Sequence, residues 1–124
     1  MEKINVTNHV IICGWNKHGT RIIQTIDHLA HGEKEIVLIN DLSEEKVTAL
    51  RSRFRQIKLY FVSGDFTREN ILERASIRDS QTVVVIPNET DTILSSPDEK
   101  TIFATMTIKS IDPNIRVVAY LMDK

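Results

Sequence analysis

The sequence predicts an α/β fold in which a doubly wound parallel sheet carries helices on both faces. Short apolar segments alternate with amphipathic segments along the chain. The apolar segments are nearly continuous instead of alternating with polar residues, which is typical of parallel strands buried on both faces. A turn containing two glycines joins the first apolar segment to the first amphipathic one. Sheets of this class bind ligands at such a turn, at their carboxyl edge.

Five predicted strands supply the sheet, and they are rich in β-branched residues. They span His9–Cys13, Glu35–Ile39, Lys58–Val62, Thr82–Ile86 and Ile115–Leu121. Because a helical segment separates each strand from the next, we expect right-handed crossovers and the strand order 3-2-1-4-5. A complete dinucleotide-binding fold has a sixth strand. We therefore expect residues 1–124 to be a single Rossmann-type domain that is excised from a longer chain or completed at its edge by a partner.

Four predicted helices connect these strands, with apolar residues at three- and four-residue spacing. They span Gly19–His31, Ser43–Phe54, Thr67–Ala75 and about Ser96–Ser110. The apolar residues expected to face the sheet are Ile22, Ile23, Ile26, Leu29, Ala30, Val47, Leu50, Phe54, Ile71, Leu72, Ala75, Ile102, Phe103, Met106 and Ile111.

The helix ends carry capping residues. Ser43 is a predicted N-cap, and two glutamates follow it in the first turn, where the helix dipole favours negative charge. Ser96 and Glu99 resemble a capping box with proline between them at the first helical position. Gly32 is suited to the C-terminal cap of the first helix.

Composition and charge exclude several classes of function. The chain has 124 residues, a net charge of −1 and a pI near 6.4, so we expect no broad basic surface for nucleic acid. No apolar run approaches the roughly 20 residues that cross a bilayer, and direct membrane insertion is therefore not expected. The single cysteine, Cys13, suits a reducing cytosol and is expected to act as a small buried hydrophobe.

The turn after the first strand carries the clearest candidate for ligand chemistry. Its residues are Gly14, Trp15, Asn16, Lys17, His18 and Gly19. The spacing is that of a dinucleotide-binding turn with Asn16 at the second glycine. Gly14 permits the tight turn, Gly19 lets the helix pack closely on the strand, and the free N–H groups of the first helical turn form an anion site.

Asp41 supports a nucleotide site at this turn, whereas Asn16 makes NAD binding there less favourable. Asp41 ends the second strand, where a carboxylate accepts hydrogen bonds from ribose hydroxyls. Asn16 places a side chain where a pyrophosphate approaches the backbone, which weakens the prediction of NAD binding, although its amide can itself donate to phosphate. Trp15 either stacks on a ligand or packs between subunits, and packing is the favoured interpretation.

A second motif follows the third strand and consists of Gly64, Asp65, Phe66 and Thr67. Gly64 allows a tight exit from the strand. Asp65 or Thr67 is expected to cap the next helix, because both residue types are favoured at N-caps. The alternative is that Asp65 faces a ligand, and the sequence leaves both interpretations open.

The longest connection follows the fourth strand and begins at Pro87 and Asn88. It lies beside the edge where ligands bind in such sheets, so it is either functional or an ordinary surface loop. Its Glu89 and Asp91, together with Asp65, provide hard oxygen ligands that suit Ca²⁺. The acidic residues in the first turn of the fourth helix are already explained by the helix dipole.

Together these motifs resemble the RCK (TrkA-N or KTN) regulatory domains of prokaryotic potassium channels and transporters. The resemblance covers about Asn8–Leu121. It rests on Gly-Trp after strand one, Asp41 after strand two, Gly-Asp-x-Thr after strand three and the segment Ile111–Ala119. The Gly-Trp form is similar to ligand-gated potassium channels rather than to transport subunits, which keep the second glycine.

The resemblance implies a cytoplasmic, non-enzymatic domain at the inner face of the membrane, joined to a transmembrane potassium channel pore in the same or a partner chain. Family members dimerise and form rings that ligands reshape, and their ligands are adenine nucleotides, NAD(H) or divalent cations such as Ca²⁺. Gly14, Asn16, Gly19 and Asp41 fall at nucleotide positions, and Asp65 falls at an acidic position near a ligand or cation.

An NAD(P)-binding domain of an oxidoreductase is the alternative from another class. Such an enzyme needs an acid or base beside the nicotinamide. The only imidazoles are His9, His18, His28 and His31, and none is placed for hydride chemistry by its position in the predicted elements.

Overall fold

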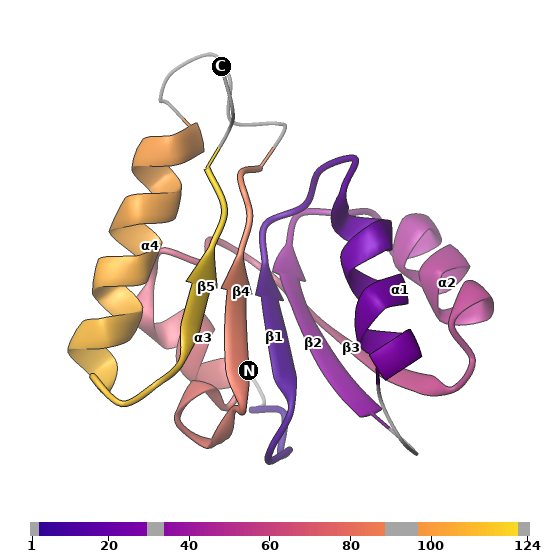
Figure 1. Ribbon diagram of the computed structural model, residues 1–124, viewed down its shortest axis with the longest axis horizontal. Helices are drawn as coiled ribbons and strands as arrows, with labels where there is room; N and C mark the ends of the chain where they lie inside the picture. Colours follow the sequence, from indigo (N-terminus) through magenta and orange to yellow (C-terminus); the bar gives the residue numbers. More distant parts are fainter. Residues whose placement is uncertain (1–2, 30–33, 89–96, 122–124) are drawn as a thin grey trace.

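A five-stranded, all-parallel sheet in the order β3-β2-β1-β4-β5 runs through the centre of the molecule (Figure 1). The structure is a computed structural model that describes residues 3–29, 34–88 and 97–121. The strands are β1 (Val10–Cys13), β2 (Lys34–Asn40), β3 (Ile57–Ser63), β4 (Thr82–Val85) and β5 (Val117–Ala119). The helices are α1 (Gly19–Leu29), α2 (Glu44–Arg53), α3 (Glu69–Arg74), the short 3₁₀ helix η1 (Ile77–Asp79) and α4 (Pro97–Ile111). The predicted fold class and strand order are confirmed.

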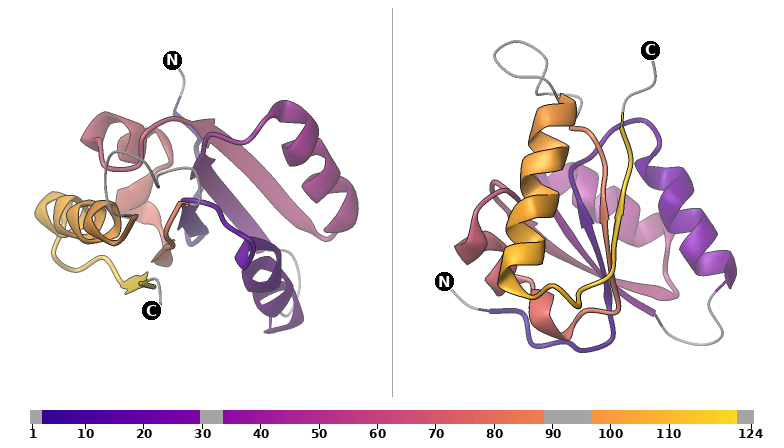
Figure 2. Two further views of the ribbon diagram at one scale, coloured as in Figure 1. Left: turned by 90° about the horizontal axis from the view of Figure 1, so that it is seen from above. Right: turned by 60° about the vertical axis from the view of Figure 1, so that its left-hand side comes forward.

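Two apolar layers cover the two faces of the sheet, because successive residues of a strand point to opposite faces. In β1, Ile11 belongs to the layer that also contains Leu72 of α3 and Ile108 of α4. Ile12 belongs to the layer that contains Ile23 of α1. Figure 2 shows α3 and α4 on one side of the sheet and α1 on the other. The central strand is therefore buried on both faces, as its continuous apolar sequence indicates.

The predicted N-cap of α2 is confirmed, whereas the predicted N-cap of α3 is not. Ser43 is the N-cap of α2, and its hydroxyl oxygen accepts a hydrogen bond from the Lys46 N–H at 3.3 Å. Helix α3 is shorter than predicted, and its N-cap is Arg68, which makes no side-chain capping bond. The prediction that Asp65 or Thr67 caps it was wrong. The chain then turns through Ser76, with φ at 55°, into η1, which was not predicted.

The predicted apolar face of α4 was wrong at Ile102, Phe103 and Met106, whereas Ile111 packs against the core as expected. Thr101, Ala104 and Ile108 are buried, whereas Ile102, Phe103 and Met106 are exposed. Apolar residues surround most of this helix, so hydrophobicity alone does not identify the face that contacts the sheet. The buried face instead uses alanine and β-branched residues.

Leu29 and the ends of β5 also differ from prediction. Leu29, the last described residue of α1, is exposed instead of facing the sheet, and the predicted helix end at His31 lies outside the described residues. Strand β5 covers only Val117–Ala119, and Tyr120 and Leu121 beyond it are exposed. Strand β5 pairs with β4 alone and lies at the sheet edge, so it is less buried than the central strands. Ala30, Gly32 and Ser96, which were assigned to a helix or to caps, lie outside the described residues.

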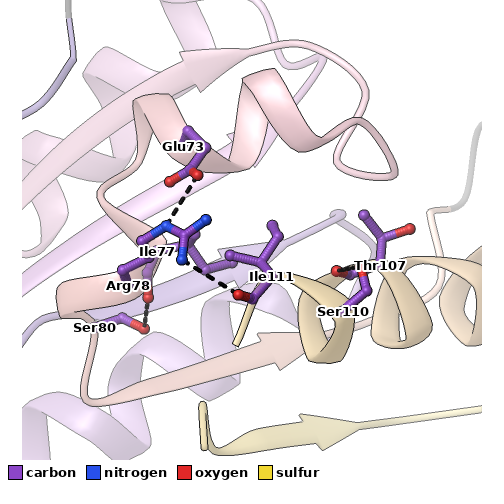
Figure 3. Close-up of polar contacts among 7 residues, drawn as sticks. All are labelled: Glu73, Ile77, Arg78, Ser80, Thr107, Ser110 and Ile111. Carbon is purple, nitrogen blue, oxygen red and sulfur yellow. Dashed lines mark hydrogen bonds and ion pairs between the residues drawn. The ribbon is translucent and has the colours of Figure 1, made fainter. Parts of the chain in front are cut away.

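One arginine links the end of α4 to α3 and η1 (Figure 3). Arg78 donates from Nε to Glu73 Oε2 at 3.0 Å and from Nη1 to the carbonyl oxygen of Ile111 at 3.2 Å. The second bond satisfies one of the carbonyl groups that a helix leaves unpaired at its C-terminus. The C-terminal end of α4 is thereby joined to its neighbours.

Candidate ligand-binding site at the carboxyl edge of the sheet

The connection between β1 and α1, residues 14–18, lies at the carboxyl edge of the sheet and requires glycine at its first position. Gly14 has φ at +88°, and a Cβ there would lie 2.2 Å from the carbonyl oxygen of Ile86. The N–H of Ile86 donates to the Cys13 carbonyl at 2.9 Å. Gly14 thus brings the β1–α1 turn into close contact with the chain that leaves β4.

Asn16 fills the position at which a dinucleotide turn normally has its second glycine. Its Oδ1 accepts a hydrogen bond from the His18 N–H at 2.8 Å, and its Nδ2 donates to the Pro87 carbonyl at 2.7 Å. Beside it, the Trp15 N–H donates to Asn88 Oδ1 at 3.3 Å. Trp15, Asn16, His18, Pro87 and Asn88 were all predicted site residues, and the fold brings them together. Their polar groups bond to one another at the place expected for an anion.

Gly19 permits a close contact, although not the one that was expected. A Cβ at this position would lie 2.7 Å from the ring of Trp15, so the absent side chain makes room for the indole instead of for a strand. Trp15 is half-buried against the layer under α1 and packs within its own chain. Lys17 and His18 are exposed.

The end of β2 provides two polar side chains. Asp41 is exposed at the end of this strand, as the ribose hypothesis requires. Asn40 is buried, and its Oδ1 accepts a hydrogen bond from the Leu42 N–H at 2.9 Å. Among the described residues, Asn40 Nδ2 has no hydrogen-bond partner.

The connection between β3 and α3, residues 64–68, has a different design. Asp65 Oδ1 accepts hydrogen bonds from the Thr67 N–H at 2.9 Å and from the Thr67 hydroxyl at 2.7 Å. This is a local turn in which an aspartate bonds to the backbone two residues ahead. Because the carboxylate is used there, it does not reach the first turn of α3, which explains why the capping prediction failed.

Two cations flank the Asp65 carboxylate. Lys100 Nζ lies 3.9 Å from Oδ1, and Arg68 Nε lies 3.8 Å from Oδ2. Burial by itself would raise the pKa of Asp65, but the hydrogen bonds from Thr67 and the charges of Lys100 and Arg68 outweigh it and lower that pKa. Asp65 is therefore ionised at neutral pH.

Lys100 was not singled out from the sequence, because it belongs to α4 and is far from Asp65 along the chain. Its Nζ also lies 4.9 Å from the centroid of the Phe66 ring, within the range of a cation–π interaction. One signal was available, since Lys100 is the fourth residue of α4 and the helix dipole disfavours positive charge near a helix N-terminus.

Phe66 joins the two turns. Its ring is buried, and Cε2 lies 3.5 Å from the position of a Cβ on Gly14. The same ring carries Lys100 on its face. The β1–α1 turn, the β3–α3 turn and the start of α4 therefore all lie against the ring of Phe66.

Other candidate residues do not join this site. Glu89 and Asp91, proposed with Asp65 as calcium ligands, lie outside the described residues, and His31 does too. No three potential metal-ligating side chains come together in the ranges that the structure describes. Burial raises the pKa of the Cys13 thiol, consistent with a small core residue. His9 is buried and donates from Nε2 to the Ala75 carbonyl at 2.8 Å, away from both turns.

The chain is similar to regulatory domains of potassium channels. Residues 5–119 match the family described as the calcium-activated potassium channel slowpoke-like RCK domain. The chain is 28% identical over its full length to the calcium-gated potassium channel TvoK of Thermoplasma volcanium. It is 29% identical over 96% of its length to potassium channel protein 1 of Methanocaldococcus jannaschii. It spans only 33% and 31% of these two proteins.

Solved structures show the same fold. The TrkA-N domain of the inner membrane protein ybaL from Escherichia coli superposes with a TM-score of 0.69 at 16% identity, covering 94% of this chain and 74% of that one. The human SLO3 gating ring gives a TM-score of 0.66 at 15% identity, covering 94% of this chain and 20% of that one. None of the helices in the described part of the chain has the length and apolar character of a membrane span.

Proposed function

Because the chain belongs to the slowpoke-like RCK domain family of calcium-activated potassium channels, we propose that it is a cytoplasmic domain that binds a ligand and thereby controls a potassium channel pore. The pore lies in the same or a partner chain. The observation that carries this proposal is the contrast at the sheet edge, where Asp65 offers an ionised, partly exposed carboxylate while the polar groups around Asn16 already bond to one another. The domain has a regulatory role and not a catalytic one.

Calcium is the ligand that this arrangement favours. Asp65 is a hard oxygen donor held in one orientation by Thr67, which is the kind of ligand that Ca²⁺ prefers. One carboxylate is too few for a calcium site, and Glu89 and Asp91 are the proposed additional ligands. The name of the Thermoplasma volcanium relative, a calcium-gated channel, supports the same choice.

An adenine nucleotide or NAD(H) is the second candidate, bound at the β1–α1 turn with Asp41 on the ribose. The position of Asp41 after β2 supports it. The side chain of Asn16 opposes it, since the His18 N–H and the Pro87 carbonyl are its existing partners. A nucleotide would have to displace these bonds before a phosphate reached the helix.

Ligand binding controls the pore through the arrangement of several domains. A ligand shifts such an equilibrium only by the difference in its affinity for the two arrangements. We propose that copies of the domain dimerise and form a ring through the outer face of α4. Ile102, Phe103 and Met106 on that face are 51%, 57% and 64% exposed. Exposed apolar residues gathered in this way mark an interaction surface.

The assembly is tested by light scattering over a concentration series. Phe103→Glu places a charge in the apolar face and is expected to shift the chain toward monomer, whereas Thr48→Glu on the exposed side of α2 is expected to leave association unchanged. Wild-type chain that stays monomeric at every concentration would contradict assembly through α4.

The gating function is tested in a chimera in which this chain replaces the matching segment of the Thermoplasma volcanium channel. Potassium currents in bilayers are recorded against calcium concentration. We expect the wild-type chimera to respond, Asp65→Asn to abolish or strongly right-shift the response, and Asp41→Asn to respond like wild type. A calcium response that is lost in Asp41→Asn and kept in Asp65→Asn would contradict the role of Asp65 and assign the ligand-binding site to the nucleotide position.

A further inference from the structure

A fully buried histidine lies directly before β1, at the amino edge of the sheet. His9 donates from Nε2 to the Ala75 carbonyl at 2.8 Å. Its Nδ1 has no hydrogen-bond partner among the described residues. Because the carbonyl fixes the proton of the neutral ring on Nε2, Nδ1 is the atom that takes a second proton. The surroundings of the ring provide one acceptor, which suits the neutral form only.

Residues 3–8, which precede this histidine, lie along the amino edge of the sheet (Figure 1). They dock on the junction between α3 and η1. The Ile4 N–H donates to the Arg74 carbonyl at 2.8 Å, and the Asn8 N–H donates to the Asp79 carbonyl at 2.8 Å. The docking surface is therefore the stretch of residues 74–79.

His9 bonds to the middle of this docking surface. Its partner Ala75 is followed by Ser76, whose Oγ donates to the Ile4 carbonyl. Ser76 and Asn8 have φ at 55° and 58°, and they are the non-glycine residues with positive φ in the described ranges. Such backbone persists only where the surrounding contacts enforce it. Loss of the histidine contact therefore favours release of the segment and the junction together.

The carboxylates around His9 do not hold it in the charged form. Burial lowers the pKa of His9 below its ordinary 6.5 and outweighs the Ala75 carbonyl, Glu35 of β2 and Asp79 of η1, which raise it. Glu35 Oε2 also accepts a hydrogen bond from the Tyr60 hydroxyl at 2.7 Å. The stability that the neutral ring gives is therefore present above pH 6.5 and is lost as the pH falls from there through the lowered folded-state value.

The cations around His9 add donors and no acceptor. Arg74, next to Ala75, has its Nε and Nη1 buried without a hydrogen-bond partner among the described residues. A proton on Nδ1 would be a further buried donor without an acceptor, which is unfavourable. The other cations on the neighbouring elements are exposed or donate elsewhere, and they are Lys3, Lys34 and Arg78.

From this geometry we propose that His9 is a proton-operated release for residues 3–8. With a neutral ring, the segment docks on residues 74–79. When Nδ1 takes a proton from solvent, the charged ring leaves its buried position for water and the segment undocks with it. The proton acts before β1, whereas Gly14 and the ligand site follow that strand, so this inference goes beyond the proposed function and holds for any ligand.

Hydrogen exchange measured by NMR on the 124-residue chain tests the proposal. Each rate is divided by the intrinsic rate at the same pH to give a protection factor. Between pH 7.5 and pH 5.5, we expect the protection of the Ile4 and Asn8 N–H groups to fall several-fold, up to about tenfold. The reason is that a released imidazole with the ordinary pKa of 6.5 is about nine-tenths protonated at the lower pH.

Leu38, in the buried centre of β2, reports global unfolding. Because residues 3–8 are released by a smaller opening than global unfolding, Ile4 and Asn8 should be less protected than Leu38 at both pH values. Equal protection of all three N–H groups would show that the segment is released only when the whole domain unfolds, and it would overturn the proposal.

Two glutamine variants assign the pH dependence to one ring. His9→Gln retains an amide group that can donate to the Ala75 carbonyl and does not titrate, so the protection of Ile4 and Asn8 should be the same at both pH values. His28→Gln changes an exposed histidine of α1 and should keep the wild-type pH dependence. A pH dependence that persists in His9→Gln overturns the proposal.

A measurement on the wild-type ring keeps the proposal testable even where His9→Gln does not fold. In ¹⁵N NMR spectra at pH 7.5, we expect His9 as the tautomer with its proton on Nε2, and we expect the ring to titrate below pH 6.5. A proton on Nδ1 at neutral pH, or a titration at or above pH 6.5, would contradict the proposed release.

Discussion

The β1–α1 turn and the β3–α3 turn occupy the same edge of one sheet and share the ring of Phe66, but they satisfy their polar groups in opposite ways. In the first, Asn16 joins the backbone of its own turn to Pro87 with neutral hydrogen bonds. In the second, Asp65 keeps a charge that Lys100 and Arg68 balance through solvent-accessible ion pairs. The bond from Asn16 to Pro87 is partly buried and the bond to His18 is exposed, whereas Asp65 and Arg68 are 42% and 72% exposed. A partly buried neutral hydrogen bond costs more to break than an ion pair that is open to solvent.

Under the proposed calcium function, this difference allows one fold to retain the outline of a nucleotide site and to respond to another ligand. The first turn keeps the glycine spacing of a dinucleotide-binding turn, and Gly14 makes its tight backbone contact with Ile86. Its donor and acceptor groups bind within the chain and give the structure rigidity. In the second turn, Asp65 can exchange its ion pairs with Lys100 and Arg68 for contacts with a ligand at a small cost in free energy. A ligand sensor requires such an exchange.

The largest expected effect is the loss of stability in Gly14→Ala. The new Cβ would meet the Ile86 carbonyl at 2.2 Å on a backbone with φ at +88°, and neither can be relieved by a side-chain movement. We expect a loss of about 3 kcal/mol in the free energy of unfolding, measured by urea denaturation. Gly64→Ala is the comparison in the other turn, where the nearest atom is the movable Ile71 Cδ1 at 2.7 Å. A cost at Gly64 equal to that at Gly14 would contradict the claim that the first turn is the more rigid one.

Asn16→Ala is expected to have an intermediate effect. It removes the donor to the Pro87 carbonyl, and Pro87 is buried. An unsatisfied buried acceptor costs about 1–3 kcal/mol, which the same denaturation experiment detects. Because this variant also frees the His18 N–H, it is the one in which nucleotide binding should first appear. An unchanged free energy of unfolding in Asn16→Ala would contradict the claim that the Asn16 hydrogen bonds make the first turn more rigid than the second.

Acidification is expected to have the smallest effect and to act through the second turn. The folded-state pKa of Asp65 is lowered from 3.8, so its ionised form stabilises the fold above that pH, and the contribution is lost as the pH falls through the folded value. Since the carboxylate is partly exposed, we expect less than about 1 kcal/mol. Urea midpoints between pH 5.5 and pH 3 should fall less in Asp65→Asn than in wild type. Asn16→Ala should keep the wild-type slope, because it changes no titrating group.

The sequence predicts the sheet well because its signals are local and repeated. Continuous apolar strands, the glycines of the first turn and the Ser43 cap all depend on residues that are close together in the chain. The outer face of α4 could not be predicted, because apolar residues surround that helix and only tertiary packing selects Ala104 and Ile108 for the core. The partners of Asp65 depend on the same packing, which brings Lys100 across to a distant turn.

The most direct test of the central claim is a thermal-denaturation panel with AMP, ADP, ATP, NAD⁺, NADH and calcium, applied to wild type, Asp41→Asn and Asp65→Asn. A ligand at about 100 times its dissociation constant stabilises the fold by roughly 2.7 kcal/mol, which raises the Tm of a domain of this size by several degrees. We predict that calcium raises the Tm of wild type and Asp41→Asn but not of Asp65→Asn, and that the nucleotides have no effect on wild type. A nucleotide shift that Asp41→Asn abolishes, without any response to calcium, would contradict this account and place the sensor at the first turn.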